Sequence, residues 1–222
     1  MAPITAEELL RIPSEADLLE LIDGEIRTLP FNGGRHGLIA ARAGLSLGAY
    51  VKQHGLGVAV AAGTGFLIRR NPDTVRTADV AFVRTDRWNN PEGFFEGAPD
   101  LVIEVISPNE TYTAVTGKIR DWLKSGAELV IVNDPGRQSA EIHRSLTKFD
   151  RVDIDGSLDG GTVVPAGPSR CGTYSCRSAS TGLSRAARYD GTIVATNDTT
   201  SEKAAMMARS RPRVTNGIDD TK

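Results

Sequence analysis

Three short apolar runs, separated by turn residues, most constrain what this chain can fold into. They cover residues 80–83, 101–106 and 128–132. Runs of this length between Gly, Pro, Asn and Asp residues are typical of strands that are buried on both faces. Such strands need helices packed on their sheet. The sequence therefore predicts a central sheet flanked by helices.

The segments around these runs supply the remaining elements. Thr5 begins a short capped helix, and Asp23-Gly24 is a hairpin-type turn within residues 19–29. Further along, the patterns predict a helix at 38–51 that ends before Gly55, a strand at 57–70 interrupted at 63–65, a helix at 112–125 and a hairpin strand at 140–144. The fold class predicted is α/β (α+β), with a central mixed sheet flanked by helices and an N-terminal β-hairpin.

The composition of the chain changes near Pro165. Residues 1–165 contain 17 Lys and Arg against 23 Asp and Glu, a net charge of −6, whereas residues 166–222 contain 9 against 5, a net charge of +4. The second segment has few large aliphatic residues and no periodicity, so it cannot offset the entropy of ordering its backbone. We predict one domain over residues 1–165 and a poorly ordered basic tail over 166–222, with a short helix at 201–209.

Composition excludes several classes of protein. No apolar run is long enough to cross a membrane, and the N-terminus lacks the layout of a signal peptide. Cys171 and Cys176 are the two cysteines of the chain, too few for a disulfide scaffold or a four-cysteine zinc site. A cytoplasmic protein is the expectation. The net charge of the domain argues mildly against tight nonspecific binding of nucleic acid. It leaves open either a local basic cleft or scattered solvated arginines, and the arginines concerned are Arg35, Arg42, Arg69, Arg70 and Arg76.

Acidic residues occur where strand burial alone would not place them. Asp79 precedes one apolar run, Asp100 precedes the next, and Glu104 lies in the middle of that second run. A buried carboxylate is costly unless a cation or hydrogen-bond donors receive it. If the two strands pair antiparallel, Asp79 lies beside Glu104 and Asp100 lies at the far end. Paired carboxylates suit Mg²⁺ or Mn²⁺. The alternative is that Glu104 forms a structural ion pair with an arginine.

Lys118 is the candidate cation for this cluster. Val115, Ile119 and Trp122 follow helical spacing and define the core face of their helix. Lys118 precedes Trp122 by four residues and could point inward along the edge of that face. The alternative is a solvated lysine such as Lys124.

Several segments of the sequence resemble one family. They are residues 20–26 (Glu-Leu-Ile-Asp-Gly-Glu-Ile), 35–37 (Arg-His-Gly), 78–83 (Ala-Asp-Val-Ala-Phe-Val), 99–108 (Pro-Asp-Leu-Val-Ile-Glu-Val-Ile-Ser-Pro) and 117–118 (Gly-Lys). In this order and spacing, over about residues 3–165, they resemble the Uma family of bacterial restriction endonucleases, within the PD-(D/E)XK nuclease superfamily. The resemblance implies a restriction-endonuclease-like core.

The resemblance also implies the residues of the site. It makes Asp79, Glu104 and Lys118 catalytic, and Asp79, Glu104 and Val105 the ligands of Mg²⁺ or Mn²⁺. The superfamily's usual lysine, two residues after the glutamate, is replaced here by Ile106, and Lys118 on the next helix matches it instead. The accessory candidates are Glu20, Glu25, His36 and Asp100.

The predicted function is a metal-dependent endonuclease that hydrolyses phosphodiester bonds in DNA. The resemblance further implies a homodimer, because restriction nucleases of this superfamily often cut two strands as dimers, although the chain contains no heptad repeat. One alternative is a non-catalytic nucleic-acid-binding or accessory protein that keeps the fold. Another is a structural domain without a ligand.

The tail departs from the family's usual ending, which is a short apolar segment rich in Leu and Pro. Val163-Val164-Pro165 begins such an ending and then gives way to a polar sequence. Codons can be chosen for Pro165 to Cys176 that encode an apolar ending when read two bases later. We hypothesise that residues from about 166 onward result from a frameshift. The gene sequence tests this hypothesis, since the actual codons either restore the apolar ending or do not.

Overall fold

The structure of the protein is a computed structural model, which describes residues 2–13, 18–108, 110–153, 157–165 and 173–175. The chain divides into two compact units, Met1–Leu183 and Ser184–Lys222, and every described residue belongs to the first. The predicted tail, its helix at 201–209 and both cysteines lie outside the described residues, apart from Thr173–Ser175. None of the described helices is long and apolar enough to cross a membrane.

A six-stranded mixed sheet contains all three apolar runs. Its strands are β3 (Gly57–Ala61), β6 (Val80–Arg84), β8 (Leu101–Val105), β9 (Leu129–Asp134), β10 (Ser139–His143) and β11 (Phe149–Asp153). Their order is β11-β10-β9-β8-β6-β3. All neighbours are antiparallel except β8 and β9, which are parallel and are connected through α3 (Tyr112–Lys124). The predicted mixed sheet is confirmed.

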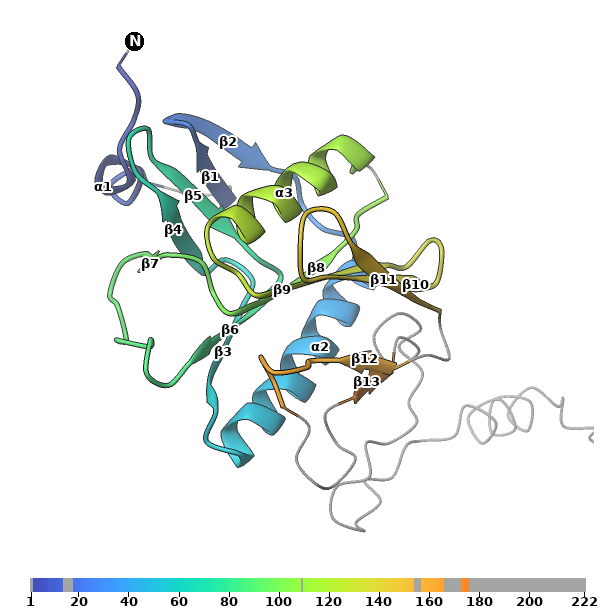
Figure 1. Cartoon of the computed structure of the whole chain (residues 1–222). Coiled ribbons are helices and arrows are strands. Elements are labelled where there is room, and N and C mark those ends of the chain that lie inside the picture. Colours follow the sequence, from blue (N-terminus) through green and yellow to red (C-terminus); the bar gives the residue numbers. More distant parts are fainter. Residues whose placement is uncertain (1, 14–17, 109, 154–156, 166–172, 176–222) are drawn as a thin grey trace, which may run out of the picture. The chain divides into compact units, whose positions relative to one another are not determined.

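Two helices cover opposite faces of this sheet (Figure 1). The longer helix, α2 (Gly34–Gln53), begins four residues before its predicted start and buries Leu47, Tyr50 and Val51 against one face. Alternate residues of the strands reach the other face, where α3 buries Val115, Ile119 and Trp122. This alternation follows from the two-residue period of a strand. It places Glu104 on the α3 side, because its neighbour Val102 packs with that cluster.

A second sheet contains the N-terminal hairpin. Its strands are β1 (Leu18–Ile22), β2 (Glu25–Leu29), β4 (Gly65–Arg69), β5 (Thr74–Thr77) and β7 (Phe95–Glu96), in the order β2-β1-β5-β4-β7. The hairpin was predicted, but β5 and β7 were not. Residues 57–70, expected as one interrupted strand, form β3 and β4 in different sheets. Gly63, with φ of 88°, lies in the turn that separates them.

The ends of the domain are held by specific contacts. Helix α1 (Ala6–Leu9) has a capping box between Thr5 and Glu8, and it packs Ala6 and Leu9 against the second sheet. At the other end, Val163 and Val164 are buried in the α2-side core. A short antiparallel pair joins β12 (Ser157–Asp159) to β13 (Thr173–Ser175).

Candidate active site

The register of two neighbouring strands brings the two predicted acidic residues together. Strand β6 pairs antiparallel with β8, and Val80 lies opposite Ile103. Asp79, immediately before β6, is therefore beside Glu104, as the antiparallel prediction required. The negative charge of Asp79 acts on Glu104 and raises its pKa. The pair lies near one end of the sheet, because Asp79 immediately precedes β6 and Glu104 is the second-to-last residue of β8.

His36 and the β8 backbone hold the Asp79 carboxylate. Oδ2 of Asp79 lies 3.1 Å from Nε2 of His36 and accepts a hydrogen bond of 2.8 Å from the Val105 backbone N–H. The hydrogen bond to Asp79 raises the pKa of His36, and a hydrogen bond to the Val105 backbone raises it further. His36 lies in the first turn of α2 and is buried. His36 thus contacts Asp79 and the Val105 backbone, which are two of the three positions predicted to hold a metal.

Glu104 is buried against helix α3. Its Oε1 accepts a hydrogen bond of 2.9 Å from Nε1 of Trp122, and its Oε2 lies 3.4 Å from Nζ of Lys118. Burial raises the pKa of Glu104 to about 7, and the charge of Asp79 adds to this effect, whereas Lys118 and Trp122 oppose it. Glu104 therefore has no arginine partner among its described contacts; lysine fills that place.

Lys118 points toward the carboxylates rather than into solvent. Its side chain is only 19% exposed and also pairs with Glu110, at 3.0 Å between Nζ and Oε1. Burial by itself would lower the pKa of Lys118, but Glu104 and Glu110 together raise it above its ordinary value. The ammonium is therefore charged at neutral pH and is held between two carboxylates.

A buried ion network connects α3 to the second sheet. Arg76 on β5 donates a hydrogen bond of 2.7 Å to Oε2 of Glu20 on β1. It also donates two hydrogen bonds to Oδ2 of Asp121 on α3, one of 3.1 Å from Nε and one of 2.5 Å from Nη2. Oε1 of Glu20 accepts from the Thr77 backbone N–H at 2.9 Å. The charge of Glu20 is felt at both Glu104 and Lys118. Glu20 is thus close to the site and paired, and Arg76 anchors the helix that carries Lys118.

The other two accessory candidates lie apart from the carboxylate pair. Asp100 is at the opposite end of β8, where it is buried and pairs with Arg84 at 2.8 Å and Arg87 at 2.9 Å. Glu25 is exposed on β2 and pairs with its neighbour Arg27. The structure gives both of these carboxylates cations of their own, away from Asp79.

Four of the five arginines considered for a basic cleft bind separate partners. Arg69 pairs with Asp23, Arg70 pairs with Glu7, Asp73 and Glu96, and Arg76 is buried in the network with Glu20 and Asp121. Arg35 differs because it lies at the start of α2 beside His36, and it donates to the Pro135 carbonyl at 2.9 Å. Of this set, Arg35 is the arginine nearest in sequence to a site residue.

The donor atoms of this site fit a hard divalent cation. Two adjacent buried carboxylates repel each other, and a cation between them removes that repulsion. Within the described part of the chain, no three or more His, Cys, Asp or Glu side chains are grouped to hold a metal. Mg²⁺ does not require such a group, since it keeps several waters and binds through one or two carboxylates together with substrate phosphates. Asp79 and Glu104 are the two carboxylates that the strand register places side by side here.

A cavity of about 410 Å³ opens beside the site. Its lining includes Arg35 and His36 from the start of α2, Ser107 and Glu110 from the segment after β8, and Arg137 from the turn after β9. His36 contacts Asp79 and Glu110 contacts Lys118, so the cavity reaches the outer partners of the catalytic candidates. The cavity is lined by these partners and not by Asp79, Glu104 or Lys118 themselves.

Sequence reasoning missed two partners in the site. Glu110 precedes α3 in a polar segment, and nothing in its spacing distinguishes it from a residue that favours a helix start. Trp122 was predicted as core, which is correct, but its N–H also donates to Glu104. A buried tryptophan usually needs an acceptor, and that requirement could have linked Trp122 to the buried carboxylate.

The raised pKa of Glu104 predicts a pH dependence of stability. Folded Glu104 holds its proton more tightly than the unfolded chain does, so the free energy of unfolding falls as pH rises from about 4.5 to about 7. The Glu104→Gln variant lacks this titration. Its stability relative to wild type is expected to increase by roughly 2 kcal/mol between about pH 5 and about pH 8 in chelator. Urea unfolding at both pH values measures the difference, and a constant difference would contradict the prediction.

The fold and this site define the class of protein: a restriction-endonuclease-like α/β domain. The family model described as "Putative restriction endonuclease", Uma2, matches residues 6–163, and the chain belongs to this family. The match ends two residues before Pro165, where the composition changes. The crystal structure of a putative nuclease belonging to DUF820 from Anabaena variabilis ATCC 29413 is similar to this chain. It is 25% identical, with a TM-score of 0.62 over 73% of this chain and 92% of the other. No curated protein matches the chain.

Proposed function

We propose that the protein is a metal-dependent endonuclease that hydrolyses phosphodiester bonds in DNA. The observation that carries the proposal is the convergence of Asp79, Glu104 and Lys118, from β6, β8 and α3, in a member of a restriction endonuclease family. Two carboxylates and an ammonium at the end of a sheet suit phosphoryl chemistry, where charge on the phosphate oxygens must be stabilised. The cavity lined by His36 and Glu110, the partners of Asp79 and Lys118, is the route by which we expect the substrate to approach.

Each residue has a part that follows from its contacts. Asp79, Glu104 and the backbone of Val105 would hold Mg²⁺ or Mn²⁺, which when bound lowers the pKa of a water and neutralises phosphate charge. Lys118 is positively charged and orients the attacking water or the scissile phosphate. His36 positions the Asp79 carboxylate, and Trp122 and Glu110 position Glu104 and Lys118 respectively.

A titration of Mg²⁺ and Mn²⁺ against supercoiled and single-stranded DNA tests this proposal. We expect wild-type protein to cut DNA only when metal is present. Nicked circles would indicate single-strand cuts by one subunit, and linear product would support the homodimer that the family resemblance implies. DNA binding without metal-dependent cutting, by folded protein, would instead favour the non-catalytic alternative. That binding would weaken with added salt.

Lys118→Ala is expected to reduce cleavage by about a hundredfold or more, because the ammonium stabilises the transition state. Lys124→Ala is the matched control, since Lys124 lies exposed on the last turn of the same helix. The cleavage rate at saturating metal measures both variants. Equal rates for the two variants would remove Lys118 from the proposed mechanism.

A further inference from the structure

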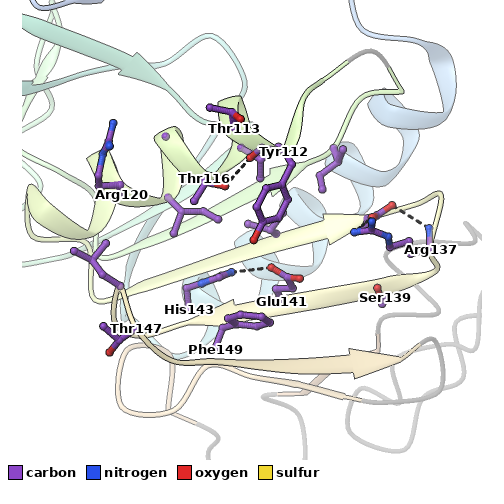
Figure 2. Close-up of a pocket in the computed structure, with 17 residues that line it drawn as sticks. Tyr112, Thr113, Thr116, Arg120, Arg137, Ser139, Glu141, His143, Thr147 and Phe149 are labelled. Atoms are coloured by element: carbon purple, nitrogen blue, oxygen red, sulfur yellow. Dashed lines mark hydrogen bonds and ion pairs between the residues drawn. The ribbon is translucent and has the colours of Figure 1, made fainter.

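A second cavity, of about 550 Å³, is lined by residues of α3 and of the strands β9, β10 and β11. Figure 2 shows Tyr112, Thr116 and Arg120 of the helix on one side and Glu141, His143 and Phe149 of the strands on the other. Cavities of roughly 300 to 1,000 Å³ are typical for small ligands. This volume can take one or two nucleotides and is far too small for a duplex. We call this cavity the α3 groove.

Aromatic side chains and guanidinium groups border the α3 groove. Tyr112 is 74% exposed and Phe149 is 47% exposed, although both are large rings that a soluble protein normally buries in part. The guanidinium groups of Arg120 and Arg137 are also largely exposed beside the groove. Tyr112 and Arg120 supply the combination that binds unpaired nucleic acid, since a base stacks on a ring and a phosphate pairs with a guanidinium group. Phe149 is already stacked on His143, and Arg137 is already paired with Asp134, so both border the groove without being free to bind.

The floor of the groove is polar but its charges are compensated. Glu141 lies 3.1 Å from His143 and 2.6 Å from Arg151, and His143 stacks on Phe149 with ring centroids 4.9 Å apart. Asp134 pairs with Arg137. The carboxylates therefore do not leave a net negative floor that would repel a nucleotide. Ser139 and His143 line this floor, and both are buried.

Gly117 keeps the groove wide. It lines the groove from the middle of α3, and a Cβ placed there would meet no atom within 4 Å. Glycine in a helix interior is unfavourable relative to most residues, and here no close backbone contact requires it. The open space beside Gly117 is thus part of the groove, and the Gly-Lys pair joins a groove residue to the catalytic candidate Lys118.

The α3 groove continues into the cavity beside the active site. Five residues line both, namely Ile106, Tyr112, Val115, Asp134 and Arg137. The cavity beside the active site is lined by His36, which contacts Asp79, and by Glu110, which contacts Lys118. A strand that enters through this cavity can therefore extend along the start of α3 into the groove.

We infer that the α3 groove binds an unpaired nucleotide of the DNA strand adjacent to the phosphodiester that is cut. This inference rests on the proposed nuclease function and adds a substrate feature to it. The protein then prefers DNA with an unpaired segment next to the cut, such as a single strand or a flap, over continuous duplex.

Binding of a fluorescein-labelled oligothymidylate to the full chain in chelator tests the inference, with a duplex of mixed sequence for comparison. Tyr112→Ala is expected to weaken single-strand binding by about fivefold or more, because one stacked base is lost. Gly117→Leu should weaken it at least as much by filling the groove, while raising thermal stability through better helix propensity. Leu45→Ala, at a 75% exposed position of α2 outside the groove, is the control.

The outcomes separate the groove from the nuclease. Loss of single-strand binding in Tyr112→Ala and Gly117→Leu, with unchanged duplex binding, would support the inference. If both variants bind like wild type while metal-dependent cleavage persists, the groove assignment is wrong and the nuclease proposal stands. Binding of free thymidine monophosphate without binding of the strand would also overturn it. A wild type that neither binds nor cleaves DNA would overturn both.

Discussion

Glu104→Gln and Asp79→Asn are each expected to reduce metal-dependent DNA cleavage by at least about a thousandfold. Both substitutions keep the size of the side chain and remove one of the two adjacent carboxylates. The amide oxygen introduced by Glu104→Gln could still accept the hydrogen bond from Trp122, as Oε1 of Glu104 does at 2.9 Å. The fold should therefore persist while metal affinity is lost.

Calorimetric titration with Mn²⁺ provides a measurement that does not depend on turnover. Wild type should release binding heat that both variants lack. Glu92→Gln is the matched control, since Glu92 is an exposed carboxylate in the loop before β7. It should bind metal and cut DNA like wild type. Cleavage at wild-type rates by Glu104→Gln would show that the paired carboxylates are structural, and the nuclease site would have to be sought elsewhere.

Arg76→Met is expected to lower the free energy of unfolding by about 3 to 5 kcal/mol. Arg76 is 8% exposed and pairs with Glu20 and Asp121. Removing it leaves Glu20, which is 1% exposed, as a buried charge whose remaining donors among the described residues are those of Thr77. Urea unfolding measures the loss. Arg76→Lys should cost less, because it keeps the charge but cannot reach both carboxylates with a fork of donors.

Arg69→Met is the matched control for this prediction. Arg69 lies on β4, the neighbour of β5, and its ion pair with Asp23 is about half exposed. Exposed pairs contribute about 1 kcal/mol or less. If Arg76→Met proves no more destabilising than Arg69→Met, the network is not a stabilising link between α3 and the second sheet. Adding Glu20→Gln to Arg76→Met should recover part of the loss, because the unpaired charge is then removed.

The central features of the site could be predicted because they depend on short-range rules. The two-residue period of β8 and its antiparallel pairing with β6 are enough to place Glu104 beside Asp79. Helical spacing around Trp122 allowed Lys118 to lie on the same side but left a solvated lysine open, and the family resemblance favoured the inward position. The structure pairs Lys118 with Glu104 at 3.4 Å. The alternative of an arginine partner for Glu104 was reasonable, since Asp100 on the same strand does pair with Arg84 and Arg87.

The second sheet could not be predicted from local pattern. Strand β5 has four residues, and β7 has two and pairs parallel with β4, so neither offers enough residues to show a period. The separation of β3 and β4 into different sheets depends on which partners are available, and a single sequence does not contain that information. For the same reason Arg76 was considered a cleft residue, although its partners come from β1 and α3.

The β8–α3–β9 connection has a consequence for how such a site can evolve. Ile106, two residues after Glu104, packs on the α3 side of the sheet and lines both cavities. An ammonium from that position or from position 118 on the helix would approach Glu104 from the same side. If Lys118 is the catalytic lysine, as we propose, position 106 could supply the same ammonium after two point substitutions, with no insertion and no change of backbone path. A search for relatives that demands a lysine at the strand position would miss chains that are built like this one.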